Sequence, residues 1–224
     1  TTMNSTNTIA PLLDVEDLRV TFTSGGSLVD AVRGVSFSLG KEKLAIVGES
    51  GSGKSTVGRT LLRLHPKSAR ITASKMKFGD IDLATCSEKA MQDIRGRRMS
   101  MIMQDPKYSL NPVMRVGDQI AEAYLAHHKV PRKDANQRAL AMLEAVRIRD
   151  PQRVFRMYPH EVSGGMGQRI MIAMMMITDP EIIIADEPTS ALDSFSEVAV
   201  TEALHELFSE KTVIVVAHRL QTVK

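Results

Sequence analysis

Apolar and polar residues alternate in two stretches near the beginning of the chain, at 18–22 and at 35–39. A period of two is typical of strands that bury one face, so this pattern predicts a pair of half-buried antiparallel strands. Gly25 and Gly26 lie between the two stretches and mark the turn region, because glycine adopts backbone conformations that other residues avoid.

Three further stretches are continuously apolar rather than alternating: 44–47, 182–184 and 213–216. The first leads through a glycine-rich segment into a helix-compatible stretch at 56–64, which predicts a unit of strand, loop and helix. The other two are typical of buried parallel strands, and a helix-like stretch at 198–208 separates them.

Between these strands the chain changes to a helical pattern, from about 118 to 146. Apolar residues recur there at spacings of three and four, as Ile120, Ala123 and Tyr124 illustrate, and this period matches one face of a helix. The sequence therefore predicts an α/β fold that combines a parallel sheet, an antiparallel β region and a helical insertion.

Composition restricts the classes of protein that need to be considered. With 224 residues, of which 43% are hydrophobic and 25% charged, the chain has the make-up of one globular domain with a sizeable core. Its longest apolar runs, 170–177 and 182–185, are far shorter than the roughly 20 residues that a membrane-spanning helix needs. Cys86 is the only cysteine, and the N-terminal residues lack the pattern of a secretory signal, so we expect a cytoplasmic protein.

Charge and histidine spacing give no sign of nucleic-acid or metal binding. The net charge is only +3, with Lys and Arg spread along the chain. One short basic run, Arg95, Arg97 and Arg98, is expected to form a solvated face. His127 and His128 are adjacent, so on a helix they point to different faces and do not have the spacing of metal ligands.

The strongest chemical signal is the segment 48–55, GESGSGKS, which matches the phosphate-binding pattern G-x-x-x-x-G-K-[ST] and follows a predicted strand. Glycines allow backbone N–H groups to face a phosphate, and the following helix adds its positive end. Lys54 would reach the β- and γ-phosphates, with its side chain exposed where no nucleotide covers it, and Ser55 would bind Mg²⁺. The alternative is a flexible Gly/Ser loop. The nucleotide-binding residues expected here are Gly48, Ser50, Gly51, Ser52, Gly53, Lys54, Ser55 and Thr56.

Two carboxylates, Asp186 and Glu187, follow the apolar stretch 182–185. Ligands of open α/β sheets bind beyond the carboxyl ends of the strands, which is where these residues are expected. Asp186 would hold Mg²⁺, directly or through water, and Glu187 would orient or deprotonate an attacking water. Taken alone, such a pair is more often a solvated strand end, and it is the phosphate-loop pattern that favours the functional interpretation.

The segment 162–169, VSGGMGQR, predicts the beginning of a buried helix. Ser163 is a good N-cap residue, and apolar residues then follow at helical spacing until Asp179 and Pro180 end the helix. A helix N-terminus with a hydroxyl and bare glycine backbone can bind an anion, although a capped core helix is the plainer alternative. The methionine-rich run 171–176 is assigned to core packing.

This segment resembles the signature sequence of ABC ATPases, L-S-G-G-Q, with Val162 for Leu and Met166 for Gln. Other positions match motifs of the family in the same order along the chain. Gln104 matches the Q-loop, residues 190–193 match the D-loop, and His218 matches the switch histidine. The resemblance implies that Glu187, Gln104 and His218 are catalytic and that Gln104 also contacts Mg²⁺. It implies further nucleotide contacts from Asp186, from Asp193 and from Phe22, whose ring would stack on adenine. Three more residues would contact the ATP of a partner protomer: Ser163, Gly164 and Gly165.

The resemblance covers nearly the whole chain and implies the architecture of that family. We expect one ATPase domain over 1–224, with a P-loop NTPase core around a RecA-like parallel sheet, an antiparallel β subdomain and a helical subdomain at about 106–170. The family's C-terminal extension would be absent. The implied cofactors are ATP and Mg²⁺. The implied partners are a second ATP-binding subunit in a head-to-tail dimer, membrane permease subunits and, indirectly, a solute-binding protein, at the inner face of the cell membrane and without nucleic acid.

Within that family, two short segments are similar to importers of oligopeptides, dipeptides and nickel. One is 104–112, with Gln104-Asp105-Pro106 and Ser109-Leu110-Asn111-Pro112, and the other is Tyr158-Pro159-His160. Import is therefore expected. The segment 217–220, Ala-His-Arg-Leu, is more similar to the corresponding segment of exporter ATPases, so an exporter stays the alternative. A non-transport ABC ATPase acting on nucleic acid or ribosomes would need a coiled-coil insertion or two linked ATPase halves, and the stretch between Gln104 and Ser163 leaves room for neither. A regulatory module that does not hydrolyse ATP would more naturally lack Glu187 or His218.

Overall fold

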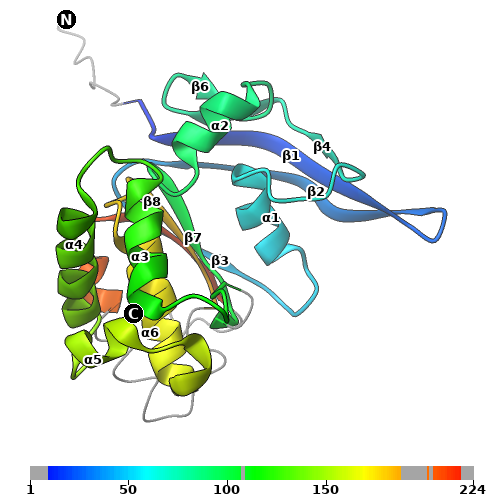
Figure 1. Cartoon of the computed structure of the whole chain (residues 1–224). Helices are drawn as coiled ribbons and strands as arrows, with labels where there is room; N and C mark the ends of the chain where they lie inside the picture. Colours follow the sequence, from blue (N-terminus) through cyan, green and yellow to red (C-terminus); the bar gives the residue numbers. More distant parts are fainter. Residues whose placement is uncertain (1–9, 107–108, 188–200, 202–203, 218–224) are drawn as a thin grey trace, which may run out of the picture.

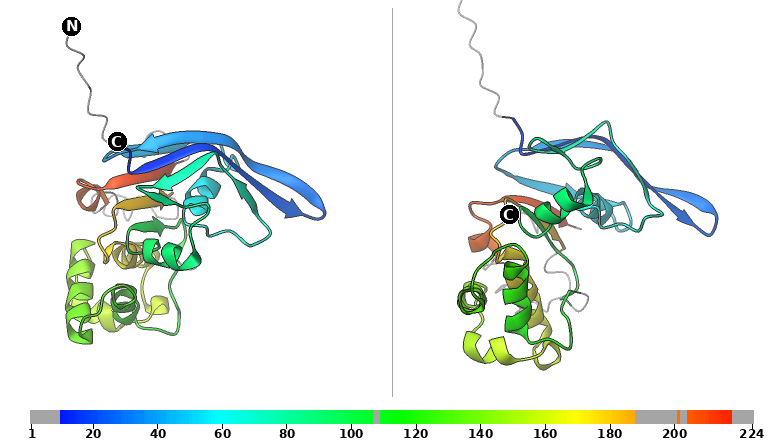
Figure 2. Two further views of the ribbon diagram at one scale, coloured as in Figure 1. Left: turned by 90° about the horizontal axis from the view of Figure 1, so that it is seen from above. Right: turned by 45° about the horizontal axis from the view of Figure 1, so that its top comes forward.

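The computed structural model describes residues 10–106, 109–187, 201 and 204–217, and all structural statements below concern this part of the chain. Its elements form an antiparallel sheet, a parallel sheet and a group of helices (Figure 1). The left view of Figure 2 shows the parallel sheet between the antiparallel sheet and most of the helices. The expected α/β fold is confirmed.

The antiparallel sheet is built on a long hairpin. Its strands are β1 (Leu13–Ser24), β2 (Ser27–Leu39), β4 (Arg70–Thr72), β5 (Lys75–Phe78) and β6 (Ile81–Asp82), in the order β2-β1-β5-β6 with β4 beside β1. The hairpin turn places Gly25 at φ 55° and Gly26 at φ 83°, which is why glycine is needed there. The two antiparallel strands predicted from the alternating pattern are thus present, and each is longer than predicted.

The parallel sheet has the order β3-β9-β8-β7, with strands β3 (Lys43–Val47), β7 (Met99–Ile102), β8 (Ile182–Asp186) and β9 (Thr212–Ala217). All three neighbouring pairs are parallel, and every residue of β8 is buried. Val47 pairs with Ala217 and Asp186 pairs with Val216, so β3, β8 and β9 end at the same edge. The continuous apolar runs of the sequence predicted β3, β8 and β9, whereas β7 was not predicted.

Helix α1 (Lys54–Leu61) begins directly after the glycine-rich segment and packs closely on the parallel sheet. A Cβ atom at Gly58 would lie 2.9 Å from Cγ2 of Ile184, so glycine permits this close approach of helix and strand. Helix α2 (Glu88–Ile94) follows the antiparallel sheet, and the Ser87 hydroxyl accepts from the Ala90 N–H at its N-terminus.

The remaining helices lie together on one side of the parallel sheet: α3 (Val116–Leu125), α4 (Arg132–Ala145), α5 (Pro151–Arg156), the 3₁₀ turn η2 (Pro159–Glu161) and α6 (Gly164–Met176). The helical stretch predicted at 118–146 is therefore two helices, divided before Pro131. Of the helix expected at 198–208, residues 198–200, 202 and 203 lie outside the described residues, while 201 and 204–207 are helical. Within the described part of the chain, each helix is too short or too polar to cross a membrane.

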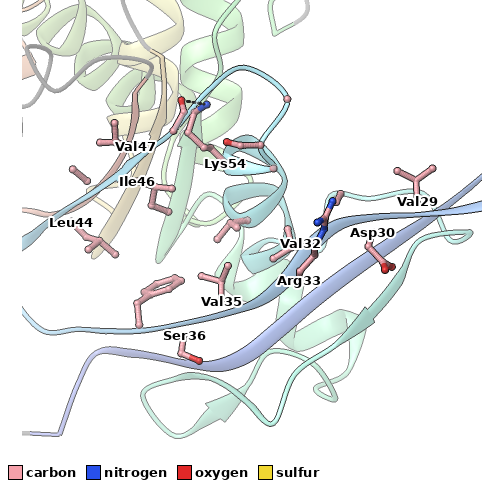
Figure 3. A pocket seen from close by; sticks show the side chains of 18 residues that line it. Val29, Asp30, Val32, Arg33, Val35, Ser36, Leu44, Ile46, Val47 and Lys54 are labelled. Carbon is pink, nitrogen blue, oxygen red and sulfur yellow. Dashed lines mark hydrogen bonds between the residues drawn. The ribbon is translucent and has the colours of Figure 1, made fainter.

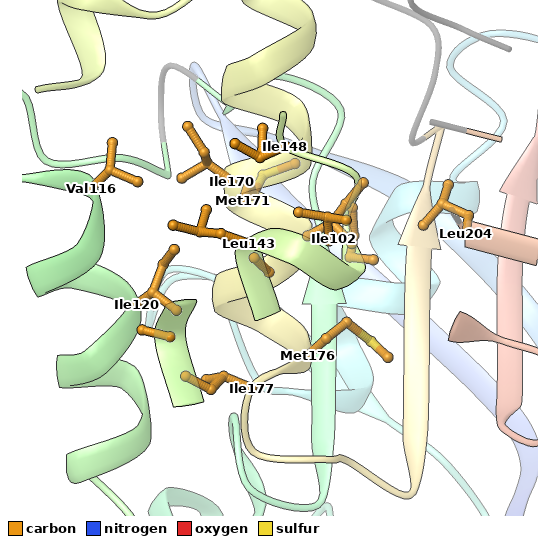
Figure 4. Close-up of a cluster of buried hydrophobic side chains, with 14 of the residues drawn as sticks. Ile102, Val116, Ile120, Leu143, Ile148, Ile170, Met171, Met176, Ile177 and Leu204 are labelled. Carbon is orange, nitrogen blue, oxygen red and sulfur yellow. The ribbon is translucent and has the colours of Figure 1, made fainter. Parts of the chain in front are cut away.

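Two clusters of buried side chains hold these layers together. One joins α3, α4 and α6 to β7, β8 and β9 (Figure 4), and it includes Met171 at 0% and Met176 at 4% exposure. The other joins the antiparallel sheet to α1, α2 and the parallel strands through residues such as Phe78 and Leu61. The methionine-rich run of α6 contributes to the core, as the sequence predicts.

The basic run at 95–98 is only in part the solvated face that we expected, because Arg97 is exposed but Arg95 and Arg98 have partners within the fold. Arg95 donates from Nε to the Leu62 carbonyl oxygen at 2.7 Å, and Arg98 donates from Nε to Oε1 of Glu181 at 2.5 Å. The Arg98 guanidinium also lies 4.3 Å from the centroid of the Phe78 ring. Both side chains are half-buried, because a guanidinium can meet carbonyl, carboxylate and aromatic partners while its stem packs.

Gly117 offers a direct test of the packing between α3 and α5. A Cβ atom at this position would lie 2.2 Å from atoms of the Phe155 ring. We expect Gly117→Ala to lower the free energy of unfolding by about 1 to 3 kcal/mol, because the ring must move out of a packed position. Urea denaturation measures this, with Gly40→Ala as the control, since a Cβ atom there would have no neighbour within 4 Å. Equal stability of the two variants would contradict the packing described.

Candidate functional site

The loop between β3 and α1 curls over the carboxyl edge of the parallel sheet. Gly51 has φ 78° and Gly53 has φ 90°, a left-handed region that glycine adopts without strain. The Ser52 N–H donates to the Glu49 carbonyl at 3.3 Å and closes the turn. Helix α1 begins at Lys54, so the unpaired N–H groups of its first turn follow the loop, the arrangement expected of a phosphate site.

Lys54 lies inside this loop. Its Nζ donates to the carbonyl oxygens of Gly48 at 2.8 Å and Glu49 at 2.6 Å, and the residue is only 7% exposed. The expectation that Lys54 would be exposed is therefore wrong. The loop carbonyls solvate its ammonium group, which is held close to the position that the sequence pattern assigns to phosphate.

A hydrogen bond connects the loop to strand β8. The Ser55 hydroxyl donates to Oδ1 of Asp186 at 2.7 Å, although the two residues are 131 positions apart. Asp186 is the last residue of β8 and is 2% exposed. A hydroxyl and a carboxylate at this distance suit Mg²⁺, which prefers oxygen ligands. The described residues contain no group of three or more His, Cys, Asp or Glu that could hold a metal.

Gln104 and Glu187 line the same cavity from just beyond the ends of β7 and β8. Gln104 lies just after β7 and donates from Nε2 to Oε2 of Glu187 at 3.3 Å. Glu187 has φ 44°, which is unusual for a residue with a side chain, and its N–H donates to the Val216 carbonyl at 3.0 Å. Backbone strain at this position is the kind of cost that is typical of functional sites.

These groups enclose a polar cavity of about 250 Å³. Its lining confirms that the structure brings most of the predicted loop residues together with Gln104 and Glu187: Ala31, Ser50, Gly51, Gly53, Lys54, Ser55, Thr56, Gln104 and Glu187. The cavity combines a cation, backbone donors at a helix end, a carboxylate and an amide. Such a set can bind a phosphate group and activate a water molecule beside it.

No sequence pattern predicts that Ala31 lines the cavity. β1 and β2 change register between Val20 and Thr21, and Ala31 is the residue of β2 that the pairing skips. A bulge of this kind redirects the backbone, and a Cβ atom at Gly53 would lie 2.2 Å from the Ala31 carbonyl oxygen. An apolar residue within a strand gives no local sign that it lines a phosphate cavity.

A larger, mainly apolar pocket of about 900 Å³ adjoins the polar cavity and shares Ala31, Gly51, Gly53 and Lys54 with it (Figure 3). Side chains of β2 and β3, including Val29 and Val47, line it. We locate the chemical site in the smaller cavity because the polar and charged groups converge there.

The structure does not bring every predicted residue to this cavity. The Ser163 hydroxyl accepts from the Met166 N–H at 3.3 Å and caps α6, as predicted, but Ser163, Gly164 and Gly165 do not line the cavity. Phe22 is half-buried in β1 and lies outside the lining as well. Asp193 and His218 are outside the described residues.

Comparison with known proteins places this geometry in a family. The family described as ABC transporter matches residues 32–190, which is more than half of the chain. The chain belongs to the ABC transporter family. The match includes the loop at 48–55, both carboxylates at the end of β8 and the segment at 163–165.

Curated ABC relatives include two proteins of Bacillus subtilis. The dipeptide transport ATP-binding protein DppD is 47% identical over 95% of this chain, and the oligopeptide transport ATP-binding protein OppD is 42% identical over 96%. The chain spans 64% and 61% of their respective lengths.

Solved ABC structures have the same fold. A dimeric structure of the cassette MJ0796 bound to ADP and Pi aligns with a TM-score of 0.81 at 24% identity, covering 94% of this chain and 89% of that one. A second dimeric structure of MJ0796 aligns with a TM-score of 0.77 at 26% identity and the same coverage. The expected architecture of an ABC ATPase is therefore confirmed.

Two glycine variants separate backbone strain from close contact in the phosphate loop. Gly51→Ala should cost about 1 to 2 kcal/mol, because alanine disfavours the left-handed region, while its Cβ atom would have no neighbour within 4 Å. Gly53→Ala should cost about 1 to 3 kcal/mol more, because its Cβ atom would also collide with the Ala31 carbonyl. Thermal denaturation compares the two, and equal losses would show that Ala31 does not press against the loop.

Proposed function

We propose that this chain is the ATP-binding subunit of a peptide importer and that it binds and hydrolyses ATP with Mg²⁺. The observation that carries the proposal is the meeting of Lys54, Gln104 and Glu187 in one polar cavity, with Ser55 bonded to Asp186 at its edge. The structural likeness to a cassette bound to ADP and Pi agrees with a nucleotide in this position.

Each group in the cavity has a distinct task in the proposed reaction. Lys54 exchanges its two carbonyl partners for the β- and γ-phosphates of ATP. Ser55, Asp186 and Gln104 offer oxygen ligands for Mg²⁺, which when bound would neutralise charge on the phosphates. Glu187 orients and deprotonates the attacking water, and its hydrogen bond from Gln104 fixes the carboxylate.

The proposed active form is a head-to-tail pair of ATP-binding subunits. Ser163, Gly164 and Gly165 lie at the N-terminus of α6, where Ser163 and Gly164 are exposed, and they do not line the cavity of their own chain. They would complete the site of the second subunit by binding its γ-phosphate. Asp193 and His218 are assigned to the same composite site by the family resemblance alone.

The chain is proposed to act as one ATPase domain, 1–224, whose helical subdomain, about 106–170, meets the membrane permeases. The helices α3 to α6 lie together on one side of the parallel sheet, with one core cluster that also includes residues of β7, β8 and β9, so their outer side is available to a partner. The protein would lie on the inner face of the cell membrane and respond indirectly to a solute-binding protein, without a nucleic-acid partner.

Peptides are the substrate class that we propose. The DppD and OppD proteins of Bacillus subtilis carry dipeptide and oligopeptide transport in their names, and both align with nearly the whole of this chain. The similarity to these two proteins favours peptides over nickel as the substrate and import over export. The segment 104–112, which is similar to importers of this group, favours import as well.

Glu187→Gln tests the chemistry. The variant should keep ATP affinity but lower turnover by about 10²- to 10³-fold, or roughly 3 to 4 kcal/mol of transition-state stabilisation, because an amide cannot take the proton of the attacking water. It should also accumulate ATP-bound dimers, which size-exclusion chromatography with light scattering detects. Glu144→Gln, at an exposed position of α4, is the matched control and should hydrolyse ATP at the parent rate.

Unchanged turnover in Glu187→Gln would remove this residue from the reaction. A monomer at saturating ATP, under conditions where the intact transporter works, would contradict the shared site.

The import proposal is tested with the complete transporter in lipid vesicles. If this subunit powers import, its ATPase rate should rise when a peptide-loaded binding protein is added to the outside face. The unloaded binding protein serves as the control. A rate that responds instead to peptide alone on the nucleotide side, without a binding protein, would favour export while leaving the ATPase assignment intact.

A further inference from the structure

His65 connects strand β1 to the helix that follows the phosphate loop. Its ring meets the Phe22 ring edge to face, with centroids 5.3 Å apart and planes at 79°. Its Nε2 lies 2.9 Å from Oγ1 of Thr60 and 3.2 Å from the carbonyl oxygen of Thr56, both in α1. Thr56 is in the first turn of that helix, two residues after Lys54.

The hydrogen bonds determine which nitrogen of His65 carries the proton. The Thr60 hydroxyl donates to the Thr56 carbonyl at 2.7 Å, so its oxygen is left to accept, and the carbonyl can only accept. Nε2 must therefore be the N–H donor. Burial lowers the pKa of His65, the hydrogen bond to the Thr56 carbonyl partly opposes this, and the positive charge of Arg59 lowers the pKa further, so the net shift favours the neutral ring.

Phe22 lies on the face of the hairpin that borders the larger pocket. It pairs directly with Val29, and opposed residues of antiparallel strands project from the same face of a sheet. Val29 lines the larger pocket, which continues into the phosphate cavity through Ala31, Gly53 and Lys54. A nucleotide whose phosphates occupy the loop can therefore extend its base towards this side of β1.

We propose that His65 is a positioning residue for nucleobase binding. It holds the Phe22 ring in one orientation relative to α1, so that the base of ATP stacks on an aromatic surface that is already fixed. The proposal rests on the proposed function, because it takes ATP as the ligand. An anchored ring loses less conformational freedom on binding, and an aromatic contact of this kind changes affinity by about two- to tenfold.

The test compares ATP with inorganic tripolyphosphate, which has the phosphates but no base. His65→Ala should weaken ATP binding by about three- to tenfold in equilibrium dialysis and raise the KM of hydrolysis by a similar factor, with kcat unchanged. Tripolyphosphate affinity should not change, because the phosphate loop is untouched. Phe22→Ala should have the same effect, and adding His65→Ala to it should weaken ATP binding no further, since the two residues act through one contact.

His127→Ala is the matched control, because His127 is also half-buried with a pKa lowered by burial. It should leave both affinities as they are. His65→Gln, which retains an N–H donor for α1 but not the ring, serves as the second variant if His65→Ala does not fold, and it should show the same selective loss for ATP.

Three results would overturn the proposal: unchanged ATP affinity in the His65 variants, equal losses for ATP and tripolyphosphate, or additive effects of His65→Ala and Phe22→Ala. Parent protein that binds tripolyphosphate but not ATP would refute the proposed function together with this inference. Parent protein that binds ATP normally while the His65 variants bind it equally well would refute this inference alone.

Discussion

The hydrogen bond from Ser55 to Asp186 is the contact on which the arrangement of the site depends. It joins the N-terminus of α1 to the end of β8, so the phosphate loop cannot move independently of the sheet. This contact exists because β3, β8 and β9 are parallel and in register, with Asp186 opposite Val216 and Val47 opposite Ala217. Parallel strands buried on both faces hold their carboxyl ends at one edge, and the polar groups of a site can gather only there.

The close packing of α1 on the sheet maintains that geometry. Gly58 allows the helix to approach Ile184, and Gly53 allows the loop to pass the Ala31 carbonyl of the antiparallel sheet. The loop is thus held between two sheets, with Lys54 already among its carbonyl oxygens. Such preorganisation means that ordering the loop costs little when a phosphate binds. The site on one chain nevertheless has no contribution from 163–165, which is the physical reason for proposing a second subunit.

Features encoded by short sequence patterns were predictable, and features that arise from distant contacts were not. Local periodicity and residue type predict β1, β2, β3, β8 and β9, the phosphate loop and the Ser163 cap. The low exposure of Lys54 was not predicted, because it depends on where two loop carbonyls point. The partial burial of Arg95 and Arg98 was not predicted either, because it depends on partners far along the chain. Ala31 had no signal, since a bulge follows from the register of two strands. The assignments of Asp193 and His218, outside the described residues, stay predictions.

The central claim is that this loop and the adjoining strand ends form a site for MgATP hydrolysis. The most direct measurement is the Mg²⁺-dependent ATP turnover of Lys54→Ala beside the parent protein, with urea denaturation of both. The account predicts that turnover is lost while the cooperative unfolding of the domain is kept, because removing Lys54 takes away the side-chain cation from the phosphate loop without removing core contacts. A folded Lys54→Ala protein that hydrolyses ATP at the parent rate would contradict it.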